Sequence, residues 1–269
     1  MKSPVLAIVA AVALMFCVRA ALAGERAFPI YDNMFFTGKP DSASAGLEAS
    51  NIIYGGAIWP GGLNYGVLPS RKAFDAIVAA HRKAAGPIVL DIEHLPLSGD
   101  RRTVMERLHV LATLADWTRA DARGRVVGYF GYNTLTGVAP ENRDCARALA
   151  RHVDAFFPPM YAHGDDRAVW VRRAEDEIRE NRGYAPGKPI FFYLWPQYDA
   201  HTPRQFQWID RAYWRFQLDT SYRDADGIVL WGPGHVGWNT SSGWWTATLA
   251  FMQHVLRLAQ PITTAATGE

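Results

Sequence analysis

The sequence predicts an α/β fold, a single-domain TIM-like (β/α) barrel with seven or eight parallel strands. The chain has 269 residues, of which 49% are hydrophobic and 13% aromatic, and this is enough for one sizeable core of the α/β-barrel size class. Short apolar runs of β type alternate with segments of helical periodicity. Strands that are apolar almost throughout, with helices between them, are typical of a parallel sheet covered on both faces. Seven such units fit a barrel better than an open sheet.

Seven runs have the length and the composition of strands. Their bounds are 27–31, 51–54, 87–91, 126–130, 155–160, 190–194 and 227–231. The region 32–50, between the first two runs, has the composition of a loop.

Start signals mark several of the helices between the strands. Ser70 predicts the beginning of one helix, because a serine side chain accepts a hydrogen bond from a free N–H group of the first turn. The pair Thr202-Pro203 predicts the start of another, which would carry Phe206 and Ile209 on its apolar face. Two more helices are predicted, one over 102–120 and one that begins at Gly243.

The two ends of the chain are expected to lie outside the barrel. Lys2 precedes an apolar run over 4–18, and the sequence Ala-Leu-Ala at 21–23 fits a signal-peptide cleavage site. The run is shorter than the roughly 20 residues that span a bilayer. We therefore expect a signal peptide at 1–23, a barrel catalytic domain at 24–259 and a flexible tail at 260–269. The mature protein is expected to be secreted or periplasmic, without a membrane span, and monomeric.

Charge and motifs argue against several classes of partner. The formal net charge of +2 is spread without a basic block, so neither a nucleic-acid surface nor a polybasic membrane patch is indicated. No G-x-G-x-x-G follows a strand, and no phosphate loop or H-E-x-x-H pair occurs. We expect no cofactor and no bound metal. Cys145 is the one cysteine of the mature chain, which excludes an intramolecular disulfide.

Two carboxyl groups follow the strand at 87–91, in the sequence PIVLDIEHLPLSG. The active site of a parallel barrel lies at the carboxyl ends of its strands, and strand side chains alternate faces, so Val89, Asp91 and Glu93 should share one face. Two carboxylates so close together disfavour double ionisation, which predicts one acid with a raised pKa. A proton donor beside an anion suits glycosidic cleavage, with Glu93 and Asp91 as catalytic residues. Alternatively, the pair caps a helix or binds an arginine such as Arg101.

Aromatic and amide side chains recur at the same ends of the other strands. Pyranose C–H faces stack on aromatic rings, and sugar hydroxyls need hydrogen-bond partners. This pattern predicts a groove for a polysaccharide or oligosaccharide, although any single ring could instead close the core. The predicted substrate-binding residues are Trp59, Tyr129, Asn133, Tyr161, Tyr193, Trp195, Gln197 and Trp231.

Four stretches together resemble the hyaluronidase family of glycoside hydrolases, and more loosely the chitinase-like enzymes with substrate-assisted chemistry. They are DIE at 91–93, FFPPMY at 156–161, FFYLWPQYD at 191–199 and DGIVLWG at 226–232. The chain differs from animal hyaluronidases in carrying Ile92 where they usually have tryptophan, in its single mature cysteine and in its tighter loops. An exopolysaccharide or a cell-wall glycan fits the chain at least as well as hyaluronan.

The resemblance implies a seven-stranded barrel and a role for each matched residue. Glu93 would protonate the leaving oxygen and later activate water. Asp91 would orient the 2-acetamido group of the substrate as this group attacks the anomeric carbon. Tyr161 and Tyr193 would hydrogen-bond the acetamido group or the neighbouring sugar, and Trp231 would form the floor of the pocket.

Three other interpretations remain open on the sequence alone. A glycosidase with its own nucleophile or base would need a second carboxylate opposite Glu93, for which the candidates are Asp154, Asp165 and Asp199. The groove could also bind glycan without cleaving it, as a recognition or export accessory protein. A metal-dependent polysaccharide deacetylase could use His94 beside Glu93, or His163 with Asp165 and Asp166.

Overall fold

The computed structural model describes residues 27–62, 64, 66–131, 140–200 and 202–258. The predicted signal peptide at 1–23, the predicted tail at 260–269 and the candidate Asn133 lie outside the described residues. They remain predictions from the sequence.

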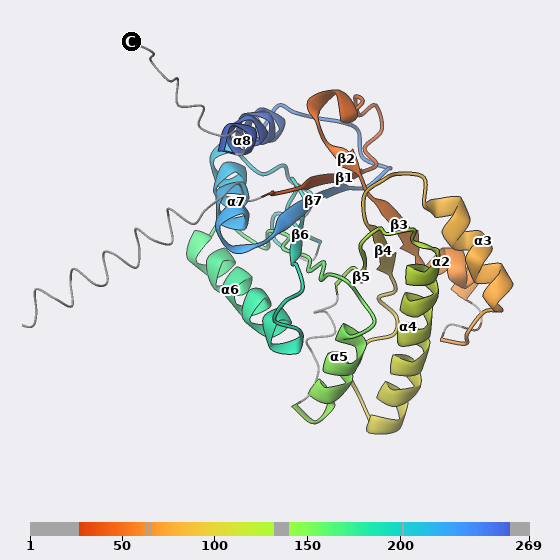
Figure 1. The fold of residues 1–269 in the computed structure, drawn as a ribbon. Coiled ribbons are helices and arrows are strands. Elements are labelled where there is room, and N and C mark those ends of the chain that lie inside the picture. Colours follow the sequence, from red (N-terminus) through yellow and green to blue (C-terminus); the bar gives the residue numbers. More distant parts are fainter. Residues whose placement is uncertain (1–26, 63, 65, 132–139, 201, 259–269) are drawn as a thin grey trace, which may run out of the picture.

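Parallel strands form the centre of the molecule (Figure 1). One sheet has the order β2-β1-β7-β6 and a second has the order β3-β4-β5, and the neighbouring strands within each sheet are parallel. The strands are β1 (Ile30–Met34), β2 (Glu48–Ala49), β3 (Asn51–Tyr54), β4 (Ile88–Asp91), β5 (Val127–Tyr129), β6 (Phe191–Leu194) and β7 (Gly227–Gly232).

Backbone contacts on two sides join the two sheets into a ring. On one side, the segment 155–160 makes parallel bridges to both neighbours, from Phe157 to Phe130 and from Phe156 to Ile190. On the other side, β2 runs directly into β3, since the Ser50 N–H still donates to Asp32 in β1 and the Asn51 N–H already donates to Pro87 beside β4. The predicted TIM-like barrel is thereby confirmed.

The structure agrees with most of the predicted strands and differs at two of them. The first strand begins and ends three residues later than predicted, so that it includes Asn33 and Met34, which the sequence assigned to a loop. The segment 155–160 forms isolated bridges rather than a continuous ladder, because Pro158 and Pro159 have no N–H group to donate.

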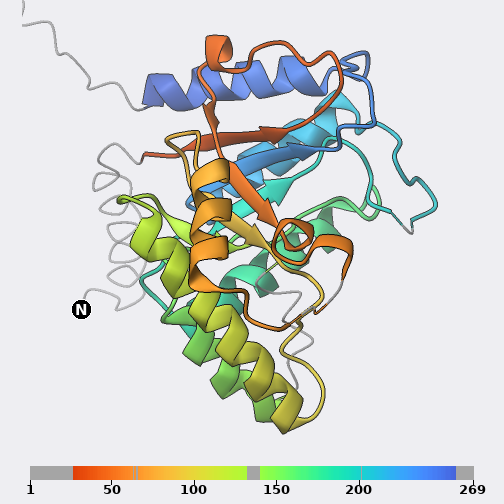
Figure 2. The ribbon, with the colours of Figure 1, turned by 90° about the vertical axis from the view of Figure 1, so that its right-hand side faces the viewer.

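Helices lie around the outside of the strands, as Figures 1 and 2 show from two directions. Their bounds are α2 (Gly55–Ile58), α3 (Arg71–His81), α4 (Arg101–Asp121), α5 (Arg143–Ala150), α6 (Arg167–Tyr184), α7 (Arg211–Asp224) and α8 (Trp244–Leu258). The Ser70 side chain accepts from the Ala73 N–H and begins α3 as predicted. None of these described helices is long and apolar enough to cross a membrane.

The predicted helix start at Thr202 is wrong. The following helix, α7, begins at Arg211, where the Asp210 side chain accepts from the N–H groups of Ala212 and Tyr213. Residues 197–208 instead form an irregular hairpin, of which all but residue 201 are described. An antiparallel bridge from Gln197 to Trp208 closes this hairpin. Phe206 and Ile209 both lie on the returning arm of this hairpin, where their N–H groups donate to the carbonyls of Tyr198 and Pro196, so their spacing does not mark a helix face.

Side chains alternate between the inside of the barrel and the helix layer. Val89 belongs to an inner cluster with Ala155, Phe157, Phe191, Tyr193 and Val229, whereas its neighbours Ile88 and Leu90 pack in the larger cluster under the helices. Asp91 is two residues beyond Val89 and continues the inner face. The alternation thus directs this carboxyl group to the mouth of the barrel.

Candidate active site

A cavity of about 640 Å³ opens at the carboxyl ends of the strands. This is the end of a parallel barrel at which active sites are built. Loops and strand ends from β3, β4, β6 and β7 contribute to its walls. The lining side chains that matter below are Tyr54, Trp59, Asp91, Glu93, Phe130, Tyr161, Tyr193, Trp195, Asp199, Phe206 and Trp231.

Asp91 and Glu93 both line this cavity. Asp91 is the last residue of β4, and Glu93 is exposed in the turn that follows, while Ile92 between them is buried away from solvent. Burial, together with the smaller effect of the nearby charge of Glu93, raises the pKa of Asp91 to about 7. The pair therefore retains a proton near neutrality, held in the free protein at Asp91.

Arg101 does not bind the acidic pair. Its guanidinium forms a bidentate contact with Asp144, with 2.6 and 2.5 Å between the paired atoms. The carboxyl groups of Asp91 and Glu93 face the cavity instead, where a substrate can reach them.

Three rings form a connected aromatic wall of the cavity. Tyr161 stacks on Trp231 with 5.7 Å between ring centroids, and Trp195 meets Trp231 edge to face at 4.8 Å. Trp59 also lines the cavity, and its indole N–H donates to the Val67 carbonyl at 2.7 Å. The rings at this mouth are thus fixed by one another and by the backbone, and they present apolar surface to a ligand.

Tyr161 and Tyr193 are neutral hydrogen-bonding groups in this wall. Burial raises the pKa of each phenol well above its ordinary value, and the charge of Asp91 acts in the same direction. A neutral phenol can donate its proton to a carbonyl oxygen or a sugar hydroxyl.

Two residues near the pair were not identified from the sequence. Asn33, in β1, donates from Nδ2 to the Tyr193 hydroxyl at 3.1 Å, and both side chains are buried. Tyr54 ends β3, pairs in register with Asp91 and accepts a hydrogen bond from Trp231. Tyr54 could have been found as the polar ring at the end of a predicted strand, whereas Asn33 lay in the predicted loop.

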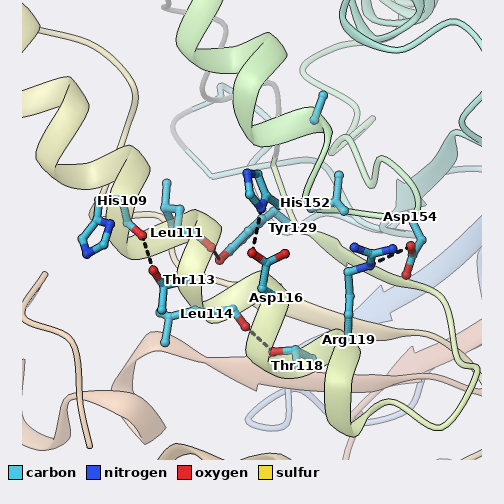
Figure 3. A network of polar contacts seen from close by, with 12 residues as sticks. His109, Leu111, Thr113, Leu114, Asp116, Thr118, Arg119, Tyr129, His152 and Asp154 are labelled. Atoms are coloured by element: carbon cyan, nitrogen blue, oxygen red, sulfur yellow. Dashed lines mark hydrogen bonds and ion pairs between the residues drawn. The ribbon is translucent and has the colours of Figure 1, made fainter. Parts of the chain in front are cut away.

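Two predicted binding residues do not line the cavity. The Tyr129 hydroxyl donates to the Leu111 carbonyl in α4 at 2.7 Å, so this side chain points into the helix layer (Figure 3). Its neighbour Phe130 lines the cavity instead, because alternate residues of a strand face opposite sides. Gln197 is buried, and its amide accepts from the Trp195 N–H and donates to the Phe206 carbonyl.

Of the three candidates for a second carboxylate, Asp199 lines the cavity. Its Oδ2 lies 3.1 Å from His163 Nε2, and its Oδ1 accepts from the Ala200 N–H at 2.7 Å. Asp154 binds Arg119 and the Val127 N–H on the α4 side of the barrel (Figure 3). Asp165 binds Tyr198 and Arg204. Asp154 and Asp165 are therefore occupied by structural contacts.

The two candidate metal sites, His94 with Glu93 and His163 with Asp165 and Asp166, do not bring enough ligands together to hold an ion. Across the described parts of the chain, no three His, Cys, Asp or Glu side chains converge as a group that could hold an ion. His163 instead pairs with the Asp199 carboxylate.

Comparison with solved structures shows that the fold is similar to that of bee venom hyaluronidase. The chain is similar to bee venom hyaluronidase, with 15% identity and a TM-score of 0.60 over 87% of this chain and 100% of that one. The same enzyme in complex with a hyaluronic acid tetramer matches with 14% identity and a TM-score of 0.56, over 86% and 96%. A GH18 chitinase from Pseudoalteromonas aurantia matches at 10% identity with a TM-score of 0.47, over 77% of each chain. Neither a protein-family model nor a curated protein sequence matches this chain.

The match to bee venom hyaluronidase confirms the predicted resemblance at the level of the fold, as a distant one. At identities of 14 and 15%, the shared feature is the course of the backbone.

Proposed function

We propose that this protein is a glycoside hydrolase, secreted or periplasmic, that cleaves glycosidic bonds of a polysaccharide by carboxylate acid/base catalysis. One observation carries the proposal. Asp91 and Glu93 share a cavity at the barrel mouth, where burial and mutual charge keep a proton on the pair up to about pH 7. A proton donor next to a carboxylate, within walls of aromatic rings, is what hydrolysis of a sugar chain requires.

Glu93 is the proposed acid and base. In the first step its proton passes to the glycosidic oxygen, and the bond from that oxygen to the anomeric carbon breaks. The carbonyl oxygen of the substrate's 2-acetamido group forms the new bond to this carbon. In the second step the Glu93 carboxylate takes a proton from water, and the water oxygen attacks the anomeric carbon and restores the acetamido group. The exposure of Glu93 suits this role, because both the leaving group and water must reach it.

Asp91 is the proposed partner that makes the acetamido group a nucleophile. Its carboxylate would accept a hydrogen bond from the N–H of the acetamido group and stabilise the positive charge that develops on this group. For this, the proton that Asp91 holds in the free protein must pass to Glu93 when substrate binds, which also prepares Glu93 as the acid. Tyr161 and Tyr193 would donate to the acetamido group or to the neighbouring sugar, and Trp231 would support the sugar ring.

The cavity favours a polysaccharide or oligosaccharide as the partner. Its aromatic lining comes from four strand ends, and a bee venom enzyme of the same fold binds a hyaluronic acid tetramer. Because the chain differs from animal hyaluronidases, an exopolysaccharide or a cell-wall glycan suits it at least as well as hyaluronan.

A non-catalytic glycan-binding protein is the second candidate. The aromatic walls would serve it as well as an enzyme. A binding protein has no need of a partly buried acidic pair, which is costly to dehydrate. Turnover separates the two candidates.

The test is release of reducing ends by the purified mature protein. Glycol chitin and hyaluronan serve as polymers with acetamido groups, and carboxymethyl cellulose serves as a polymer without them. We expect cleavage of an acetamido polymer and none of the cellulose derivative. Cleavage of both classes at equal rates would remove the acetamido role of Asp91, and binding without any cleavage would establish the second candidate.

A further inference from the structure

Phe206 has an unusual combination of backbone conformation and exposure. Its φ angle is 62°, in the left-handed region, and its side chain is 48% exposed. Bulky residues rarely adopt this conformation, because Cβ comes too close to the following carbonyl. Non-glycine residues are held in this way mainly at ligand-binding and active sites.

The surrounding hairpin fixes this conformation from both sides. The Phe206 N–H donates to the Tyr198 carbonyl at 2.9 Å, and the Phe206 carbonyl accepts from Gln197 Nε2 at 2.6 Å. The other end of the Gln197 amide accepts from the Trp195 indole N–H at 3.1 Å. One buried amide therefore holds both the Phe206 backbone and the Trp195 ring, which lines the cavity.

The ring of Phe206 contributes to the cavity rather than to the core. It lines the cavity and lies at a 50° tilt to Trp195, with 5.8 Å between centroids. A strained segment thus holds a half-exposed apolar ring at the rim of a sugar-sized cavity, where a ligand can contact it.

Asp199 and Ala200 line the cavity on the same hairpin. Within the described part of the chain, Oδ1 and Oδ2 of Asp199 each contact one partner, and a carboxylate oxygen can accept more than one hydrogen bond. Tyr54, 40% exposed, lines the cavity from β3. The hairpin thus offers a ring for the C–H face of a pyranose and a carboxylate for its hydroxyls.

We propose that Phe206 is the stacking platform of a second sugar subsite, adjacent to the sugar that reacts at Asp91 and Glu93. The substrate is then a chain of at least two sugars, bound across the mouth of the barrel, with Asp199 accepting hydrogen bonds from the sugar that stacks on Phe206. This inference rests on the proposed function and specifies its substrate.

The test compares a polymer with a short substrate. The polymer is the one among glycol chitin and hyaluronan that wild type cuts, and the short substrate is a 4-methylumbelliferyl glycoside of the N-acetylhexosamine at its cleavage site. In Phe206→Asn, which tolerates left-handed backbone but lacks the ring, the ratio of kcat/KM for polymer to kcat/KM for the short substrate should fall about tenfold. Phe206→Tyr keeps a ring and should keep the ratio within about twofold.

Two controls separate a subsite from a structural role. Leu256→Ala removes another exposed apolar side chain, on α8, and should leave the ratio at the wild-type value. The Tm of Phe206→Asn should not fall, since asparagine suits the backbone. An unchanged ratio in Phe206→Asn, or an equal loss on both substrates together with a lower Tm, would overturn the proposal.

A binding measurement separates this inference from the proposed function. In the Glu93→Gln background, glycol chitin or hyaluronan in the gel should retard the protein, and adding Phe206→Asn should abolish the retardation. If wild type cuts no polymer but Phe206→Asn still abolishes retardation, the subsite stands and the catalytic proposal fails. Cleavage by wild type with equal retardation of both proteins would overturn the subsite alone, and neither cleavage nor retardation would overturn both.

Discussion

The side-chain amide of Asn33 donates a hydrogen bond to the Tyr193 hydroxyl, with 3.1 Å between Nδ2 and the phenolic oxygen. Because the oxygen of Tyr193 accepts this bond, its own proton remains available to the cavity that the ring lines. Asn33 thus sets the direction in which Tyr193 donates. We regard it as a positioning residue for the proposed reaction.

This relationship predicts that Asn33→Ala lowers kcat on the cleaved polymer by about tenfold, less than the loss of about a hundredfold or more on removing a direct donor, because the Tyr193 hydroxyl itself remains. Asn33→Asp should lose more, since a carboxylate would accept the hydrogen bond that the Tyr193 hydroxyl otherwise donates into the cavity. In a Tyr193→Phe background, Asn33→Ala should have almost no additional effect, because the two residues act as one unit. Losses that simply multiply in the double variant would assign Asn33 a separate, structural role.

The proton shared by Asp91 and Glu93 predicts a pH dependence of activity. Because Glu93 must carry that proton when the glycosidic oxygen leaves, kcat/KM should fall above about pH 7, where the pair loses it. The measurement is a pH profile of kcat/KM from pH 5 to 9. In the residual activity of Asp91→Asn, the decline near pH 7 should be displaced, and an unchanged midpoint would show that another group causes it.

The same pKa predicts a pH dependence of stability. The pKa of Asp91 is raised from 3.8 to about 7 in the folded protein, so between these values the folded state binds a proton that the unfolded state releases. Wild type therefore loses stability as the pH rises through this range, by up to about 1.4 kcal/mol per pH unit, and the penalty is constant above about pH 7.

Asp91→Asn has no such penalty. Its stability relative to wild type should grow from about pH 4 to about pH 7 and then level off. Urea unfolding at a series of pH values measures the difference, and a difference that does not vary with pH would refute the assignment of the raised pKa to Asp91.

The packing of the barrel interior predicts a strong effect at one glycine. A Cβ atom at Gly128, in β5, would lie 2.4 Å from the Ala155 carbonyl oxygen and 2.6 Å from the Phe157 ring. Gly128→Ala should therefore reduce the free energy of unfolding by about 1–3 kcal/mol. Gly183→Ala in α6 is the matched control, since a Cβ there meets nothing within 4 Å, and it should gain about 0.5–1 kcal/mol. Similar effects of the two substitutions would argue against the close packing of β5 on the segment 155–160.

The sequence could predict the barrel because its strands are apolar on both faces and are bounded by polar residues. The same pattern could predict the acidic pair, since alternation from Val89 settles the face of Asp91. Tyr129 has the opposite parity: its side chain lies in the helix layer, and the next residue, Phe130, lines the cavity. Parity along a strand, rather than position at its end, decides which side chain reaches a ligand.

The remaining errors arose where local signals compete with distant contacts. Asn33 was missed because β1 begins and ends three residues beyond its predicted run, and its last residues are held by pairing with β7. Thr202-Pro203 has the form of a helix start, yet the bridge from Gln197 to Trp208 and the cap at Asp210 delay the helix. Phe206 is held by hydrogen bonds to residues on the opposite arm of a hairpin. The spacing of apolar residues along the sequence does not reveal such hydrogen bonds.

The central claim of this account is that Glu93 donates and accepts the proton in glycosidic cleavage, and one paired measurement tests it most directly. Reducing-end release from the cleaved polymer is followed for wild type and for Glu93→Gln at equal concentration. The Tm of the variant is measured to show that it is folded as stably as wild type. We predict a loss of at least about a hundredfold in kcat, the usual effect of removing a general acid and base. Glu93→Gln that cuts the polymer as fast as wild type would contradict the assignment and, with it, the proposed mechanism.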